Sequence, residues 1–108
     1  MATFTLDRTT AGRPLSVARG DTVVVSLDEI PTSGYRWEVA GIDPTVLHLT
    51  DDDYIPSGGG GVGGGGQRDF QFEVVGPGQT ELRLIRRRSW EAESEAVDGF
   101  SARVVATP

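Results

Sequence analysis

Short runs that alternate apolar and polar side chains recur along the whole chain, and they indicate strands rather than helices. Successive side chains of a strand point to opposite faces, so an alternating run buries one face and exposes the other. In residues 68–75, Phe70, Phe72 and Val74 share one face. Similar runs cover residues 3–6, 14–28, 35–39, 45–50, 80–86 and 100–106, and the Gly20-Asp21 pair divides the run at 14–28 into two candidate strands.

Residues that favour turns fill the segments between these runs. They include Pro-Thr-Ser-Gly at 31–34, Gly-Ile-Asp-Pro at 41–44 and Gly-Pro-Gly-Gln at 76–79. Residues 89–97 are rich in Glu and Ala but lack an apolar stripe, so we expect a loop there. Turn signals at this spacing, without a helical period, predict an all-β fold. We expect an immunoglobulin-like β-sandwich of seven or eight strands, with a small open barrel as the alternative.

Two local predictions follow from the pattern. The Gly-Pro-Gly-Gln segment favours a tight turn in which Gly76 or Gly78 takes a positive φ. We expect it to form a hairpin that places 68–75 and 80–86 side by side as neighbouring antiparallel strands. In residues 45–50, alternation places Leu47 and Leu49 on one face and His48 on the other.

The lack of cysteine and the single histidine exclude several kinds of site. Without cysteine there is no disulfide, no thiolate-bound metal and no nucleophilic Cys. His48 has no second histidine with which to bind zinc, and it faces outward on its strand. We therefore expect no metal, no cofactor and no catalytic activity.

Charge and hydropathy limit the partners. The net charge is −6, and all 10 basic residues are Arg, so a general nucleic-acid binder is disfavoured. No segment approaches the roughly 20 apolar residues of a membrane span, and the N-terminus has no signal-peptide pattern. We expect a monomeric, cytoplasmic protein of one domain over residues 1–108, with export left open as an alternative.

The first unusual loop contains Pro31, Thr32, Ser33, Gly34 and Tyr35. As an ordinary turn, Pro31 would fix φ, Gly34 would supply a left-handed conformation, and the hydroxyl groups would hydrogen-bond to the local backbone. A turn does not require that hydroxyl pair with an aromatic so close behind it. A functional loop is the alternative.

The second unusual segment is a glycine-rich tract at residues 56–67, which includes Gly63, Gly64, Gly65 and Gly66. It runs into a strand and carries no Gly-Lys-Ser/Thr, so it matches neither a dinucleotide-binding fingerprint nor a P-loop. It is either a passive flexible linker or a loop whose bare backbone approaches a partner closely.

The third unusual segment carries Arg88, Ser89 and Trp90. Either Trp90 folds onto the sandwich, or it is an exposed aromatic anchor next to Arg, a combination enriched at binding hot spots. A cation–π contact with an arginine would fix the Trp90 rotamer. Because strands of such a sandwich alternate in direction, all three unusual loops fall at one end. Independent spacers have no reason to collect there, whereas a composite binding edge requires it.

Together these segments resemble the chagasin family, proteinaceous inhibitors of papain-like cysteine peptidases. That family has an Asn-Pro-Thr-Thr-Gly-aromatic loop, a Gly-x-x-Gly loop before an alternating Phe strand, and an Arg-Pro-Trp loop. Here the corresponding segments are Ile-Pro-Thr-Ser-Gly-Tyr at 30–35, the tract ending at Gly66 before Arg-Asp-Phe-Gln-Phe, and Arg-Ser-Trp at 88–90. Ile30 stands for the usual Asn, and Ser89 for the usual Pro.

The resemblance implies a reversible, non-covalent inhibitor whose three loops form a wedge that occludes the peptidase cleft. By analogy, Thr32 and Ser33 lie over the catalytic Cys and His, and Gly34 turns the backbone away. Residues 63–66 line one side of the cleft, and Trp90 packs on the other with Arg88 nearby. Two alternatives remain: an adhesion or carbohydrate-binding module that uses Trp90 and Tyr35, and a structural domain whose loops only connect strands.

Overall fold

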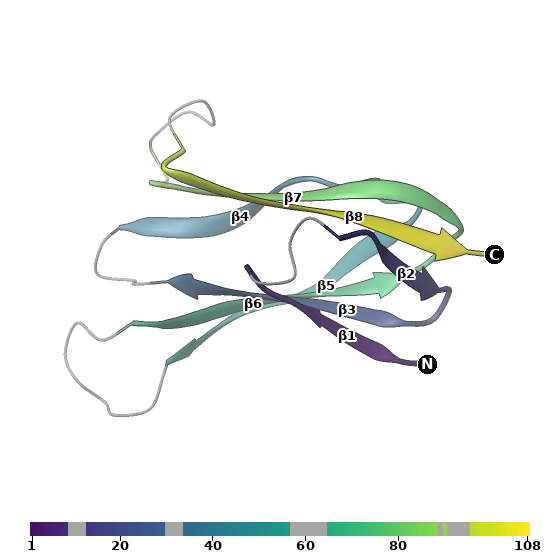
Figure 1. Cartoon of the computed structure of the whole chain (residues 1–108). Helices are drawn as coiled ribbons and strands as arrows, with labels where there is room; N and C mark the ends of the chain where they lie inside the picture. The colour runs from purple at the N-terminus through teal and green to yellow at the C-terminus, as the bar shows by residue number, and fades with distance from the viewer. Residues whose placement is uncertain (9–12, 30–33, 57–64, 89, 91–95) are drawn as a thin grey trace.

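The computed structural model describes residues 1–8, 13–29, 34–56, 65–88, 90 and 96–108, and it is a sandwich of two four-stranded sheets (Figure 1). The strands are β1 (Thr3–Leu6), β2 (Leu15–Ala18), β3 (Thr22–Glu29), β4 (Tyr35–Gly41), β5 (Leu47–Pro56), β6 (Gly66–Val74), β7 (Gly78–Arg88) and β8 (Asp98–Thr107). This confirms the predicted all-β, immunoglobulin-like sandwich. No helix in the described ranges is long and apolar enough to cross a membrane.

The strand order explains the two layers in Figure 1. One sheet has the order β1-β3-β6-β5, and the other has the order β2-β8-β7-β4. Strand β1 is parallel to β3 and β2 is parallel to β8, whereas the remaining neighbours are antiparallel. The N-terminal part of the chain therefore contributes one short edge strand to each sheet.

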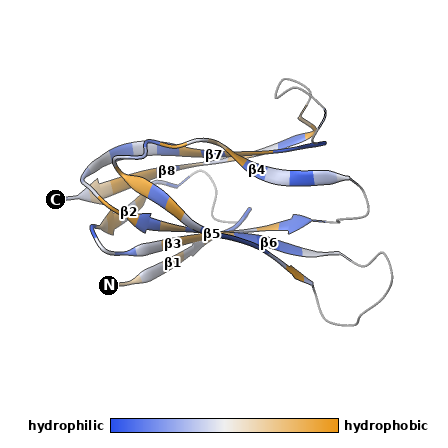
Figure 2. Ribbon diagram, turned by 180° about the vertical axis from the view of Figure 1, so that it is seen from behind, coloured by the Kyte–Doolittle hydropathy of each residue, from blue (hydrophilic) through white to orange (hydrophobic). Residues whose placement is uncertain are grey.

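Alternation along the strands builds the core between the sheets. Figure 2 shows hydrophobic and hydrophilic residues following one another along the ribbons. Phe70 and Phe72 of β6 contribute two large side chains to this core, each at most 1% exposed. The buried apolar residues that pack around them include Val23, Val25, Leu27, Trp37, Leu47, Val74, Leu82, Leu84, Phe100 and Val104.

The predicted hairpin between residues 68–75 and 80–86 is wrong. Strand β6 belongs to one sheet and β7 to the other, so the Gly-Pro-Gly segment carries the chain across the sandwich. The turn itself is as expected, because Gly78 has a φ of 135°. The Val75 N–H donates to the Val46 carbonyl at 2.9 Å, which holds the crossing chain against the β4–β5 connection. Turn chemistry predicts a reversal but not the sheet in which the next strand pairs.

Strand β5 runs further than the pattern predicted, from Leu47 to Pro56 rather than ending at residue 50. Its register against β6 shifts between Leu49 and Asp51, which ends the simple alternation. Leu49 precedes this shift and lies opposite Phe72, so it shares the face of Leu47 as expected, but it is 36% exposed. The aspartates that follow are poor strand formers, and β5 accepts them because it is an edge strand with one side in solvent.

The strands that flank the three unusual loops all meet at one end of the sandwich, which we call the loop end (left in Figure 1). Gly66 pairs with both Glu29 and Pro56, so β3, β5 and β6 are level there. In the other sheet, Tyr35 pairs with Arg88. Both chain termini lie at the opposite end (Figure 1).

Candidate functional site

The structure places part of each predicted loop at the loop end. Gly34, Tyr35, Gly65, Gly66, Arg88 and Trp90 are described. Pro31, Thr32, Ser33, Gly63, Gly64 and Ser89 lie outside the described residues, as does Ile30.

Gly34 brings the first loop against the third. Its φ of 81° is the left-handed conformation expected from the sequence. A Cβ atom built at Gly34 would lie 3.9 Å from Arg88 Nε and 3.9 Å from Trp90 Cη2. The chain therefore enters β4 from the first loop directly beside two residues of the third loop.

The guanidinium group of Arg88 contacts two aromatic rings. Its central carbon lies 4.5 Å from the Tyr35 ring centroid and 5.7 Å from the Trp90 ring centroid. Contacts of this kind contribute about 0.5–1 kcal/mol each when exposed. Trp90 is nevertheless 74% exposed, which favours the anchor interpretation over an indole folded onto the sandwich. Arg88 thus orients an aromatic side chain that remains available to a partner.

The surroundings of Gly66, at the start of β6, leave no room for a side chain. A Cβ atom there would overlap the Ile55 carbonyl oxygen and the Tyr54 hydroxyl oxygen. Gly66 also pairs with Glu29, the last residue of β3. This end of the glycine-rich tract is therefore a fitted part of the sheet, not a passive spacer.

We expect Gly66→Ala to lower the free energy of unfolding by about 1–3 kcal/mol, because the backbone of Ile55 must move to admit the methyl group. Gly41→Ala is the matched control, since no atom of the described residues lies within 4 Å of a Cβ atom at that position. Urea denaturation of both variants measures the difference. Equal stability of the two would contradict the close approach at Gly66.

A buried ion pair lies below the first two loops, and the sequence analysis missed it. Glu29 is 1% exposed and Arg68 is 8% exposed. Arg68 Nε donates to Glu29 Oε2 at 2.8 Å, and Arg68 Nη1 donates to Asp52 Oδ1 at 2.7 Å. Burial alone would lower the pKa of Arg68, but its hydrogen bonds to Asp52 and Glu29 raise it. The sequence does carry one signal for this pair: Glu29 and Arg68, of opposite charge, occupy inward-facing positions of β3 and β6.

Trp37 connects this ion pair with the third loop. Its backbone N–H donates to Glu29 Oε1 at 2.9 Å, and its Nε1 donates to the Asp28 carbonyl at 2.8 Å. The guanidinium carbons of Arg8 and Arg86 lie 5.2 and 5.4 Å from its ring centroid. The Trp37 side chain is 2% exposed, so it lies on the inward face of β4.

Asp98, the first residue of β8, anchors the far side of the third loop. It accepts hydrogen bonds from Arg8 and, at 3.1 Å, from Arg86 Nη2. Partial burial by itself would raise its pKa, but the hydrogen bonds from Arg8 and the Gly99 N–H, with the positive charges of Arg8 and Arg86, lower it. Asp98 therefore stabilises the folded state as a carboxylate.

The stabilisation by Asp98 is expected to depend on pH. Since its pKa is lower in the folded than in the unfolded state, the contribution is complete above the unfolded value of about 3.9 and is lost as the pH falls through the folded pKa. Asp98→Asn should flatten the loss of unfolding free energy below about pH 4. It should not abolish the loss, because Asp21 and Asp43 also have lowered pKa values. Urea titrations from neutral to acid pH test this, and identical slopes would contradict it.

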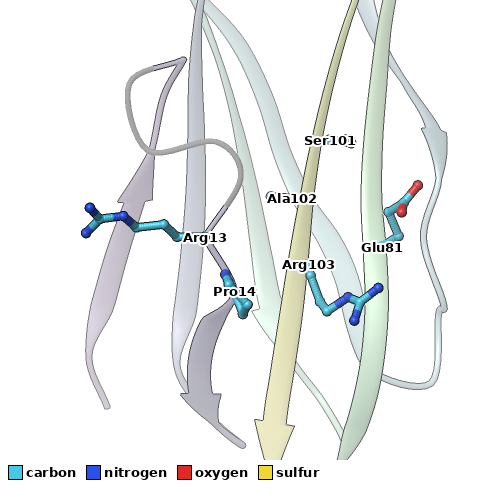
Figure 3. A pocket seen from close by; sticks show the side chains of 6 residues that line it. All are labelled: Arg13, Pro14, Glu81, Ser101, Ala102 and Arg103. Carbon is cyan, nitrogen blue, oxygen red and sulfur yellow. The ribbon is translucent and has the colours of Figure 1, made fainter.

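Two pockets differ in their position relative to the predicted loops. One of about 310 Å³ opens at the loop end and is lined by Glu29, Gly34, Arg36, Tyr54 and Arg68. Another of about 340 Å³ lies on the outer face of the second sheet, along β8, where Arg13 points away from Glu81 and Arg103 (Figure 3). The second pocket is not lined by any predicted loop residue in the described part of the chain. His48 is exposed, as expected.

Comparison with known proteins identifies the family. Residues 16–104 match the model of the family described as Chagasin family peptidase inhibitor I42. Chagasin of Trypanosoma cruzi is 29% identical over 94 residues, which cover 83% of this chain and 86% of that protein.

Solved structures share the fold. The crystal structure of the cysteine protease inhibitor EhICP2 from Entamoeba histolytica has a TM-score of 0.86 at 24% identity, covering 98% of this chain and 96% of that chain. PbICP-C, solved in complex with falcipain-2, has a TM-score of 0.68 at 14% identity, covering 97% and 89%. At these identities the structural matches establish only the shared fold. Membership of the family rests on the family model. This chain therefore belongs to the chagasin family of peptidase inhibitors, and it is an inhibitor and not an enzyme.

Proposed function

We propose that this protein is a reversible, non-covalent inhibitor of papain-like cysteine peptidases that occludes the active-site cleft with three loops. The observation that carries the proposal is the meeting of Gly34, Arg88 and the exposed Trp90 at the end where the strands flanking all three loops meet. Membership of the chagasin family supports it, and so does the similarity to PbICP-C, which is solved with falcipain-2.

Each loop has a distinct role in the proposed complex. Thr32 and Ser33 cover the catalytic Cys and His of the peptidase. The backbone around Gly63, Gly64, Gly65 and Gly66 offers hydrogen bonds to one wall of the cleft. Trp90, oriented by Arg88, packs on the other wall. No bond is made or broken in the inhibitor, so the affinity comes from a few anchors and from the fit of the loops.

A panel of papain-like peptidases tests the proposed function. We expect competitive inhibition of at least one enzyme, full recovery of activity on dilution, and an intact inhibitor by mass spectrometry. A serine peptidase and a metallopeptidase serve as controls and should be unaffected. Absence of inhibition of every papain-like enzyme at tens of micromolar would reject the proposal. Time-dependent loss that dilution does not reverse would reject its non-covalent part.

A further inference from the structure

One chain of polar and aromatic contacts links every strand that flanks an unusual loop. Asp52 of β5 binds Arg68 of β6, and Arg68 binds Glu29 of β3. Glu29 accepts the backbone N–H of Trp37 in β4. The Trp37 ring contacts Arg86 of β7, which in turn binds Asp98 of β8. These six residues, which we call the loop-base network, include one from each of six strands.

The loop-base network crosses between the sheets near the loop end. Glu29 is the last residue of β3, Asp98 is the first of β8, and Trp37 and Arg68 are each the third residue of their strand. The contacts Glu29–Trp37 and Trp37–Asp28 are both between sheets. Sheet hydrogen bonds align strands only within one layer. Contacts such as these, together with the ion pairs of Asp28 with Arg86 and Arg8, tie the first two loops to the third across the sandwich.

The burial of two network residues excludes their direct contact with a partner. The side chain of Glu29 is 1% exposed and Trp37 is 2% exposed, so a partner at the surface does not touch them. The charges inside the network are compensated, which a buried charge requires. Any effect of Glu29 on affinity must therefore pass through the position of the loops.

We propose that the loop-base network is a positioning element that holds the three loops in the one arrangement that fits a peptidase cleft. This inference rests on the proposed function. Fixing a binding surface before contact reduces the ordering cost of association. If only a fraction of the free molecules has the competent arrangement, the apparent dissociation constant rises as that fraction falls. The loss then appears in the association rate, whereas loss of a direct contact appears mainly in the dissociation rate.

The test compares Glu29→Met, which removes the acceptor for the Trp37 N–H, and Arg86→Met with Val46→Ala, measured against a peptidase that the wild-type protein inhibits. Val46 is 1% exposed and lies in the β4–β5 connection, so its truncation destabilises the fold away from the network. We expect each network variant to raise Ki at least tenfold through slower association, with the dissociation rate within about twofold of wild type. Val46→Ala should leave both rate constants within about twofold at temperatures where the protein stays folded. Amide hydrogen exchange at Ile30, Thr32 and Ser33 should speed up in the network variants only.

The possible outcomes distinguish failure of the proposed function from failure of the positioning role. If the wild-type protein inhibits nothing, the proposed function fails. If the wild-type protein inhibits but both network variants keep its Ki, or if Val46→Ala weakens inhibition as much as they do, the positioning role is overturned. An effect confined to the dissociation rate would also overturn it. Arg86→Met keeps the test valid should Glu29→Met fail to fold, because Arg86 is only partly buried.

Discussion

Replacement of Arg68 by alanine is expected to lower the free energy of unfolding by about 3–5 kcal/mol, because it leaves a buried carboxylate without its partner. Glu29 is 1% exposed, and its Oε2 atom receives its hydrogen bond from Arg68 Nε. Asp52, the second partner of Arg68, has a 42% exposed side chain and can turn to water. The loss thus comes mainly from Glu29. Urea denaturation at neutral pH measures it.

A double variant isolates the charge as the cause. Glu29→Gln in the Arg68→Ala background removes the stranded negative charge while a side-chain oxygen can still accept the Trp37 N–H. We expect it to recover about half of the lost stability or more. Arg103→Ala, an exposed arginine on the outer face of the second sheet, is the matched control and should change stability by less than about 0.5 kcal/mol. A loss below about 1 kcal/mol for Arg68→Ala would contradict the buried pair.

Trp90→Ala should raise the inhibition constant by at least about 30-fold, which corresponds to about 2 kcal/mol of binding energy. The indole is 74% exposed in the free protein, so its removal should hardly change stability. The effect should appear as faster dissociation, because a contact made only in the complex is lost. Stopped-flow and progress-curve assays give both rate constants.

Leu49→Ala is the control for a non-specific loss of apolar surface, since Leu49 is also exposed but lies on β5 away from the loop end. It should leave the inhibition constant unchanged. Unaltered affinity of the Trp90→Ala protein would show that the third loop binds without its aromatic side chain.

The sequence predicted the features that depend on neighbouring residues. Alternation identified the strands and the shared face of Phe70, Phe72 and Val74, which is buried. The need for positive φ identified Gly34, and it narrowed the turn glycine to Gly76 or Gly78, of which Gly78 has the positive φ. Strand direction placed the loop-flanking strand ends together, because a chain that reverses at every turn returns to the same end.

The features that the sequence did not predict depend on distant residues. Glu29 and Arg68 are 39 positions apart, and nothing local indicates that two inward charges meet. The change of sheet between β6 and β7 is set by how the two layers pack, which the Gly-Pro-Gly segment does not encode. The length of β5 depends on its edge position, since local propensity alone argues against a strand through Asp51 and the residues after it.

The position of the chain termini has a practical consequence. Both lie at the end of the sandwich opposite the loop end (Figure 1). A tether or fusion partner attached at either terminus would therefore leave the loop end facing solvent. A form immobilised on a bead through its C-terminus should capture its peptidase as well as the free form does, and two copies joined in tandem would hold two enzyme molecules at once.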